Sequence, residues 1–454
     1  MKNYVPLIQS KRLLLLTALL ISVSSCAFAL NLLVYNNNDS GAGSLRQAIA
    51  DNNASVGTNS IIFSNIVTGT ITLTSGQLSI SKNLTIIGPG ANVLTVSGNQ
   101  ASRVFYVNNT TAIISGLTVR NGSATGTSPA DYGGGIFCHS SLGFSAALTV
   151  SNCVVNGNTA SYGAGIMNFN AASFGNSALK VIGCTISSNV ATQVGGGIYN
   201  NGVYLASTVI NNSTISGNSG GAYGGGIVNI TSSGQAFVTV IGCTISGNSS
   251  GIYNLGNGDF GGVASVSIGS TILKAGASGA NVSSPANGGS FLNSQGYNLS
   301  SDGASGRLNG TGDQINTDPK LGPLQNNGGP TMTHALLSNS PAIDKGLSFG
   351  ATTDQRGAPR TFDFSSTANA SGGDGSDIGA FELGRPTLNI QKFTTNAVLS
   401  WQSYYGDFTL QSVTNVIASN SWANVAGTPA VVASQYVLTN GPISANKFYR
   451  LKGN

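Results

Sequence analysis

The sequence predicts an all-β protein in which a right-handed parallel β-helix is followed by a small C-terminal β-sandwich. A glycine-rich opening recurs in the middle of the chain: Gly133-Gly134-Gly135-Ile136 returns at residues 163, 195 and 224, at intervals of 30, 32 and 29 residues, and in shortened form at 250. Each opening is followed by a small residue that is preceded only by Gly or Asn. Because Gly and Asn enter the left-handed backbone region at little cost, this second signature predicts a corner between two short strands. A repeat of this kind is typical of a solenoid.

Alignment of the repeats places like residues in columns. Three short strands and three turns fit in about 30 residues, so each repeat predicts one rung, and rungs stack roughly 4.8 Å apart through backbone hydrogen bonds. The right hand of the coil follows from the rule for parallel crossovers. The expected columns are the corner residues Asn152, Gly183, Asn212, Gly242 and Gly269, the small residues Cys153, Cys184, Ser213, Cys243 and Ser270, the inward residues Val155, Ile186, Ile215, Ile245 and Ile272, the third-strand residues Ile136, Ile166, Ile198, Ile227 and Ile252, and an asparagine ladder of Asn158, Asn189, Asn218 and Asn248.

The N-terminus carries the pattern of an export signal. Basic residues precede an apolar stretch at 13–23, and Ala27-Phe28-Ala29 provides a small-x-small cleavage site, so we expect residues 1–29 to be a signal peptide. Val23-Ser24-Ser25-Cys26 also resembles a lipobox, which would place a lipid on Cys26. The expected location is extracellular or on the outer surface of a bacterium, with membrane attachment only through that lipid.

Charge and cysteine content exclude several classes of function. Without the three basic residues of the leader the net charge falls from +5 to +2, so no nucleic-acid partner is expected. Four cysteines remain, and none lies in a CxxC or Cys/His pattern that predicts a metal site. Cys153 and Cys184 are expected to be vertical neighbours, but parallel in-register strands hold their side chains side by side. We therefore expect buried thiols in preference to a disulfide.

Four further regions follow the leader. Residues 30–60 are expected to form an N-terminal cap that includes a short helix beginning at Ser44, where Ser44 and Gln47 fit a capping box. Residues 61–275 are expected to form about ten rungs of the helix. Residues 276–384 are expected to close it, and residues 385–454 alternate like the strands of a small fibronectin-like sandwich.

Two segments resemble known bacterial modules. The stretch from Asp39 to Ile49, followed by the GGGI and CTISGN repeats, resembles exported right-handed β-helix proteins with a CSLREA-type N-terminal motif and, more distantly, chlamydial polymorphic outer membrane proteins. The stretch from Asp318 to Glu382 resembles the choice-of-anchor Q domain, which follows β-helices in its family. These resemblances imply a cell-surface or secreted location and name no reaction.

Acidic residues gather in only one part of the chain, at Asp344, Asp354, Asp377 and Glu382. We expect them to cap the last rung through ion pairs and turn hydrogen bonds. The alternative is an acid/base pair of a polysaccharide lyase or glycoside hydrolase, since such enzymes need clustered acids, and a structural Ca²⁺ site is a third interpretation. Within the helix itself the two acids, Asp131 and Asp259, lie more than four rungs apart by this alignment. We expect no catalytic residue, cofactor or metal ligand there.

Aromatic residues precede three of the glycine openings, at Tyr132, Tyr162 and Tyr223. A column of rings along a β-helix could stack on sugars, or it could only cover the turn. The favoured function is a non-catalytic one, in which an extended neutral-polar face contacts a polysaccharide or a host or environmental surface. The alternative is a carbohydrate-active enzyme on the same fold. The sequence does not indicate an oligomeric state.

Overall fold

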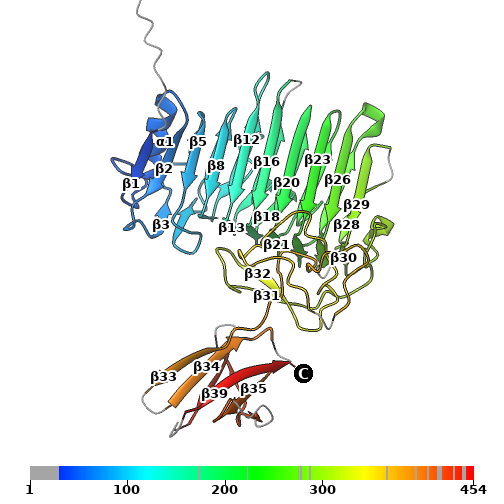
Figure 1. Ribbon diagram of the computed structural model, residues 1–454. Helices are drawn as coiled ribbons and strands as arrows, with labels where there is room; N and C mark the ends of the chain where they lie inside the picture. The colour runs from blue at the N-terminus through cyan, green and yellow to red at the C-terminus, as the bar shows by residue number, and fades with distance from the viewer. Residues whose placement is uncertain are drawn as a thin grey trace, which may run out of the picture.

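The computed structural model describes residues 30–453 except 172–173, 222, 275, 277–278, 286–287, 365–366, 394–395, 406–407, 417–421, 433–434 and 442–445. The expected signal peptide and Cys26 therefore lie outside the described residues. The described chain is almost entirely β-structure, with a large parallel solenoid and a smaller antiparallel region at the C-terminal end (Figure 1). The predicted fold class is confirmed.

Three long parallel sheets form the walls of the solenoid. Sheet A has the order β1-β2-β5-β8-β12-β16-β20-β23-β26-β29, sheet B the order β3-β6-β9-β13-β17-β21-β24-β27-β30, and sheet C the order β28-β25-β22-β19-β15-β11-β7-β4. The strands of sheet A are β1 (Asn31–Val34), β2 (Asn59–Phe63), β5 (Leu84–Ile87), β8 (Thr111–Ser115), β12 (Ala146–Ser151), β16 (Asn176–Ile182), β20 (Leu205–Asn211), β23 (Gln235–Ile241), β26 (Val263–Gly269) and β29 (Ser290–Gly296). Those of sheet B are β3 (Gly69–Thr72), β6 (Leu94–Ser97), β9 (Thr118–Arg120), β13 (Val154–Asn156), β17 (Thr185–Ser187), β21 (Thr214–Ser216), β24 (Thr244–Ser246), β27 (Ile272–Lys274) and β30 (Leu299–Ser300). Those of sheet C are β4 (Leu78–Ile80), β7 (Phe105–Asn108), β11 (Ile136–Ser140), β15 (Ile166–Asn170), β19 (Ile198–Gly202), β22 (Ile227–Thr231), β25 (Ile252–Gly256) and β28 (Val282–Ser283). A small sheet of β10 (Ser123–Ala124), β14 (Thr159–Tyr162) and β18 (Val190–Val194) bridges the turn from sheet B to sheet C.

The predicted columns are present as register pairs between successive rungs. Ile136, Ile166, Ile198, Ile227 and Ile252 follow one another in sheet C and are fully buried. Sheets A and B contribute equivalent aliphatic columns, and all three join in one core cluster that runs the length of the solenoid. Because each rung buries its apolar side only against its neighbours, the rungs are stable only as a stack.

Buried asparagines form two continuous ladders, one in the turn after sheet B and one within the strands of sheet C. Each side-chain amide donates to the next asparagine along the stack, from Asn158 through Asn189 and Asn218 to Asn248, with N–O distances of 2.8 to 2.9 Å. A second ladder, at the column where the first regular rung carries Cys138, links Asn168, Asn200, Asn229 and Asn254 at 2.7 to 2.8 Å. The repeated glycine has a reason here, because a Cβ at Gly135 would lie 2.5 Å from the carbonyl oxygen of Gly165 and 3.0 Å from the amide of Asn158.

The corner prediction is correct for four units and wrong for the fifth. Asn152, Gly183, Asn212 and Gly242 have φ between 46° and 62°, but in the fifth unit the left-handed residue is Ser270, with φ of 44°, rather than Gly269. The inward residue there is Leu273, since it pairs with Ile245, and Ile272 faces outward in register with Thr244. The fifth unit is therefore shifted by one residue relative to our alignment, which treated Ser270 as the counterpart of Cys243.

Both ends of the core are covered. The helix α1 (Leu45–Ala54) begins at Ser44, whose hydroxyl accepts the Gln47 N–H at 3.1 Å, and it buries Leu45 and Ile49 in the core of the first rungs. Only half of the expected capping box forms, because the Gln47 side chain donates to Asp51 instead. At the other end, Ala304 and Leu308, in and beside the short helix η2 (Ala304–Gly306), belong to the same core.

Residues 318–383, here called the cover segment, lie along the side of the solenoid against sheet B rather than over its last rung (Figure 1). The segment contains the hairpin of β31 (Leu321–Gln325) and β32 (Thr333–Leu336) and is otherwise irregular. Its Gln355 is the main link: the side chain accepts from the Thr214 hydroxyl at 2.6 Å and donates to the Cys184 carbonyl and to Thr331. The Gly379 N–H donates to the Ser270 carbonyl, and the Ala380 N–H donates to the Thr244 hydroxyl.

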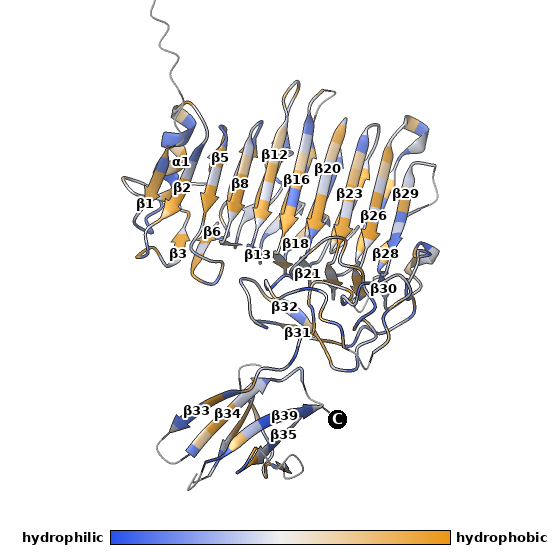
Figure 2. Ribbon diagram, in the orientation of Figure 1, coloured by the Kyte–Doolittle hydropathy of each residue, from blue (hydrophilic) through white to orange (hydrophobic). Residues whose placement is uncertain are grey.

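The C-terminal region is a pair of antiparallel sheets. One contains β33 (Asn389–Phe393), β34 (Asn396–Gln402), β38 (Gln435–Asn440) and β37 (Ala430–Val432), and the other contains β36 (Ala423–Asn424), β35 (Phe408–Val413) and β39 (Phe448–Gly453). Leu399, Trp401 and Leu410 are buried between them in a cluster that continues into the cover segment through Phe381 and Tyr404. The hydropathy colouring shows apolar residues concentrated in the strands of both regions (Figure 2).

The four described cysteines are free and buried. Cys153 and Cys184 are vertical neighbours, and the Cys153 N–H points to the Cys184 sulfur at 3.5 Å. Burial raises the pKa of Cys153 to about 12. The described part of the chain contains no helix long and apolar enough to span a membrane.

Candidate functional site

The four acids singled out in the sequence do lie together, inside the cover segment. Asp344, Asp354, Asp377 and Glu382 are each at most 3 % exposed. They do not cap the last rung, as we had expected, because the cover segment packs on sheet B. No carboxylate of this group faces open solvent.

Backbone N–H groups satisfy these carboxylates. Asp377 accepts from the N–H groups of Asp344 and Leu383 at 2.8 and 2.6 Å. Glu382 accepts from the N–H groups of Phe362 and Asp377 at 2.8 and 3.0 Å. The lone pairs that a general base needs are thus engaged in holding loops together.

Two arginines complete the acidic cluster. Asp354 accepts the Arg356 N–H and Nε–H at 2.8 Å and the Glu382 N–H at 3.0 Å, and Arg356 also stacks on the Phe381 ring, 3.6 Å from its centroid. Arg360, itself buried, donates to the carbonyls of Asp377 and Gly379 and reaches across to Asn212 on the solenoid. The ion pairs that we expected are present, and they fix the cover segment internally and against the helix.

Burial dominates the titration of this cluster. It raises the pKa of Asp344 to about 6 and that of Glu382 to about 7, although Arg360 opposes the second shift. Burial and the neighbouring Glu382 raise the pKa of Asp377 well above its ordinary value. Shifts of this kind also occur at catalytic sites, but here the groups are enclosed and already hydrogen-bonded, which favours a structural role. Among the residues that the structure describes, no three His, Cys, Asp or Glu side chains are placed to hold a metal ion.

The tyrosine column exists as predicted in register. Tyr132 pairs with Tyr162, Tyr162 with Val194, and Val194 with Tyr223, so these four residues occupy the same position on successive rungs. The rings do not form a flat stack. Tyr132 meets Tyr162 edge-on, at 5.3 Å between centroids and 79° between planes, and it also meets Phe137 and Phe169 edge-on. The rings at the start of the tyrosine column therefore pack against outward side chains of sheet C.

Sheet C itself carries the larger aromatic surface, which our sequence analysis did not identify. Outward positions of successive strands place Tyr106, Phe137, Met167, Tyr199, Val228 and Tyr253 in one column, and Asn108, His139, Phe169, Asn201, Ile230 and Leu255 in the next. The signal was present in the sequence, since from Phe137 onward these residues stand one and three positions after the isoleucine of each glycine-rich opening. We had used only the inward isoleucine.

Four rings of this face are nearly parallel. Tyr106, Phe137 and His139 stack on one another, and Phe169 stacks on His139, with centroids 5.2 to 6.1 Å apart and angles of 17° to 27° between the planes in contact. The Tyr106 hydroxyl and the His139 Nδ1 are 3.0 Å apart. We call this group, together with Tyr132 and Tyr162, the ring patch. Phe137 is buried, and the other five rings are half-buried.

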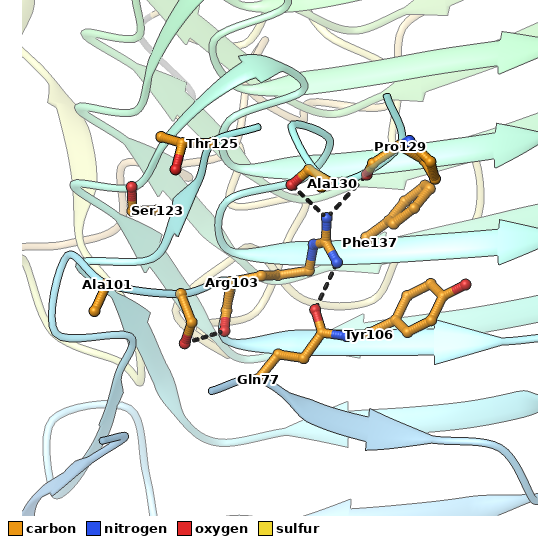
Figure 3. Close-up of a pocket in the computed structure, with 10 residues that line it drawn as sticks. Gln77, Ala101, Arg103, Tyr106, Ser123, Thr125, Pro129, Ala130 and Phe137 are labelled. Carbon is orange, nitrogen blue, oxygen red and sulfur yellow. Dashed lines mark hydrogen bonds between the residues drawn. The ribbon is translucent and has the colours of Figure 1, made fainter. Parts of the chain in front are cut away.

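The strands that carry the ring patch are uncharged. No strand of sheet C contains Lys, Arg, Asp or Glu in the part of the chain that is described. At the N-terminal end of the patch a cavity of about 470 Å³ opens, lined by Gln77, Arg103, Tyr106, Ser123 and Phe137 among others (Figure 3). Rings beside a concave site with a few polar groups are the usual composition of a site for an amphipathic ligand.

In comparisons with known proteins, no family model, curated protein or solved structure matches the chain.

Proposed function

We propose that the protein is an exported bacterial surface or secreted protein whose ring patch makes non-catalytic contact with a glycan. The observation that carries the proposal is the half-exposed ladder of rings on a rigid sheet whose strands have no formal charge. Sugar rings present C–H groups to aromatic side chains and hydroxyls to polar ones, and the patch offers both. Consecutive rungs hold the rings at a fixed spacing, so the surface needs little ordering when a chain of sugars lies along it.

The location rests on sequence features. The N-terminal 29 residues have the pattern of a signal peptide, and the segments at 39–49 and 318–382 resemble modules of exported β-helix proteins, the CSLREA-type motif and the choice-of-anchor Q domain. Within this proposal the cover segment has the position of the anchor-Q-like module. A lipid on Cys26 and release by cleavage after Ala29 are the two modes of export, and mass spectrometry of the mature N-terminus distinguishes them.

Binding is tested with the mature chain, residues 30–454, on a glycan array followed by affinity gel electrophoresis in the polysaccharides that score. The variant Tyr132→Ala/Tyr162→Ala should weaken binding roughly five- to tenfold, since an aromatic contact contributes about 0.5 to 1.5 kcal/mol. Tyr204→Ala is the matched control, because Tyr204 is exposed on a loop between sheets C and A and lies outside the patch. Equal loss in both variants would contradict the assignment to the ring patch.

The non-catalytic part of the proposal has its own measurement. Each polysaccharide that binds is incubated with the protein, with and without Ca²⁺, while ultraviolet absorbance and reducing ends are followed. Unchanged polymer is expected. Product that disappears in Asp354→Ala or Asp377→Ala would replace the proposal with an enzyme that uses the acidic cluster.

A further inference from the structure

The cavity at the end of the ring patch contains a buried cation without an acidic partner. Arg103 is 7 % exposed, and all of its hydrogen-bond acceptors are neutral. Its Nε donates to the carbonyls of Tyr132 and Gly133 at 2.8 and 2.9 Å, its Nη2 to the carbonyls of Tyr132, Pro129 and Ala130 at 2.5 to 3.3 Å, and its Nη1 to the Gln77 Oε1 at 2.6 Å.

No carboxylate forms an ion pair with Arg103 among the described residues. Asp131 is close enough to attract its charge, yet the Asp131 Oδ1 is buried and has no hydrogen-bond partner. Burial lowers the pKa of Arg103 to about 10, against the attraction of Tyr106 and Asp131, and together with burial its charge lowers the pKa of His139. A buried charge is costly unless it is paired, so an anion in this cavity would be stabilised.

The cavity also contains side-chain groups with hydrogen-bonding capacity to spare. Nη1 of Arg103 carries a second hydrogen beyond the one given to Gln77, and the amide of Gln77 has only a long contact of 3.4 Å to Ser79. The hydroxyls of Ser123 and Thr125 line the same space and have no side-chain partner in the described structure. Figure 3 shows Gln77 and the loop of Pro129 and Ala130 at the guanidinium, the stacked rings of Tyr106 and Phe137 together on one side of it, and Ser123 and Thr125 farther away on the other side.

We propose that this cavity binds the carboxylate of an acidic sugar, whose ring packs against Tyr106 at the N-terminal end of the ring patch. The carboxylate accepts from Nη1 of Arg103 and the amide of Gln77, and the sugar hydroxyls meet Ser123 and Thr125. The inference rests on the proposed glycan contact and specifies its ligand as a carboxylated glycan. A volume of about 470 Å³ is large enough for a ligand of this class, since ligand sites span roughly 300 to 1,000 Å³.

The test uses the mature chain and calorimetric titration with three probes: a polyuronate oligosaccharide, the same oligosaccharide with its carboxylates reduced to alcohols, and free N-acetylneuraminate. The polyuronate should bind about tenfold or more tightly than its reduced form, because hydrogen bonds to a charged group contribute about 1.5 to 3 kcal/mol. Added salt should narrow the difference. Tighter binding of N-acetylneuraminate than of the polyuronate would support the site and assign it to a terminal acidic sugar rather than a chain.

Variants locate the effect. Gln77→Ala and Arg103→Gln should each abolish the preference for the carboxylated form and leave the weaker binding of the reduced form. Arg103 also holds the loop of Pro129 to Gly133, so Thr125→Trp, which fills the exposed mouth of the cavity, provides a second means of removing the preference without disturbing that loop. Arg120→Gln is the matched control, since Arg120 is an exposed arginine outside this cavity.

The outcomes separate this inference from the proposed function. Equal affinity for the polyuronate and its reduced form overturns the carboxylate site and leaves the glycan contact standing. Full preference retained by folded Arg103→Gln or Thr125→Trp overturns it as well. Binding of none of the three probes, with none on the array, overturns the proposed function itself.

Discussion

The outer faces of sheets B and C are built from the same kind of repeat, yet one is covered by the chain and the other is open. Sheet B presents Thr185, Thr214 and Thr244 outward, and the cover segment contacts each of these hydroxyls. Sheet C presents large side chains, many of them aromatic, at the corresponding outward positions of its strands, and these side chains pack on one another.

The difference shows how the outward side chain of a repeat decides what covers a solenoid wall. A column of small hydroxyls lets a second backbone approach and offers it a hydrogen-bond partner on every rung. A column of rings is too bulky for a second backbone to approach, and the rings bury their apolar surface by packing on one another. Pro330 and Thr331 form the edge of the cover segment that faces the N-terminal rungs. Beyond this edge the outward residues of sheet B are Val154, Asn156 and Arg120, and a cavity of about 300 Å³ lies between them and the cover segment.

The largest effect is expected when the cover segment is detached from sheet B. Gln355→Leu removes one acceptor and one amide that serve Thr214, Cys184 and Thr331, and it leaves buried polar groups unsatisfied. We expect a loss of about 3 kcal/mol in the free energy of unfolding in urea, since each buried unsatisfied group costs about 1 to 3 kcal/mol. Gln235→Leu, at an exposed position of sheet A, should change stability by less than about 0.5 kcal/mol. Similar losses in both would contradict the role given to Gln355.

An aromatic ring placed on the outer face of sheet B should push the cover segment away from the sheet. Ser216 lies under the cover segment, where its hydroxyl is 2.9 Å from the His334 Nε2. Ser216→Tyr is expected to cost about 2 kcal/mol, as overpacking usually costs about 1 to 3 kcal/mol, and to make the cover segment sensitive to limited proteolysis. Asn201→Tyr adds the same ring to the open face of sheet C and should be tolerated within about 0.5 kcal/mol. Equal tolerance at both positions would show that hydroxyl columns are not required for covering.

The acidic cluster makes the covered face sensitive to pH. The pKa of Asp344 is raised to about 6 and that of Glu382 to about 7, so the folded state binds protons more tightly than the unfolded chain, whose carboxyls titrate near pH 4. This contribution is fully present below about pH 4 and is lost as pH rises through 6 to 7. The free energy of unfolding measured in urea should therefore fall by a few kcal/mol between pH 5 and pH 8, since one pKa unit corresponds to about 1.4 kcal/mol.

Replacement of one acid isolates this effect. Asp344→Asn should make the free energy of unfolding less dependent on pH, because it removes one group whose protonation stabilises the fold. Asp259→Asn changes an exposed acid outside the cover segment and should leave the slope as it is. A free energy of unfolding that rises with pH would contradict this prediction and show that the N–H partners stabilise the carboxylates as anions.

The smallest expected effect concerns thiol labelling. Cys138 lies beneath the open face of sheet C, whereas Cys184 lies at a corner whose carbonyl is held by Gln355. Both thiols are buried and have a raised pKa, so labelling requires local opening. We expect iodoacetamide to label Cys138 several-fold faster than Cys184, as measured by peptide mass spectrometry. Faster labelling of Cys184 would indicate that the covered side opens first.

Most of the solenoid could be predicted because stacking repeats the same physical demand on every rung. The inward isoleucines and the asparagine ladder were identifiable for that reason, and the alignment failed only at Ser270, where the fifth unit is one residue out of step. The position of the cover segment could not be predicted, since the hydrogen bonds of Gln355 join residues more than 140 positions apart. Arg103 was equally hidden, because its partners are backbone carbonyls, which any sequence provides.

The two asparagine ladders have a consequence for how the length of such a molecule can change. Every amide donates toward the C-terminal neighbour and accepts from the N-terminal one, so a duplicated unit finds both partners in place, whereas half a unit interrupts both ladders. Under the cover segment this freedom ends. Thr331, Gln355 and Ala380 together contact three successive rungs, and one inserted rung would displace these contacts by about 4.8 Å. Gene duplication can therefore lengthen the N-terminal half while the covered half keeps its size.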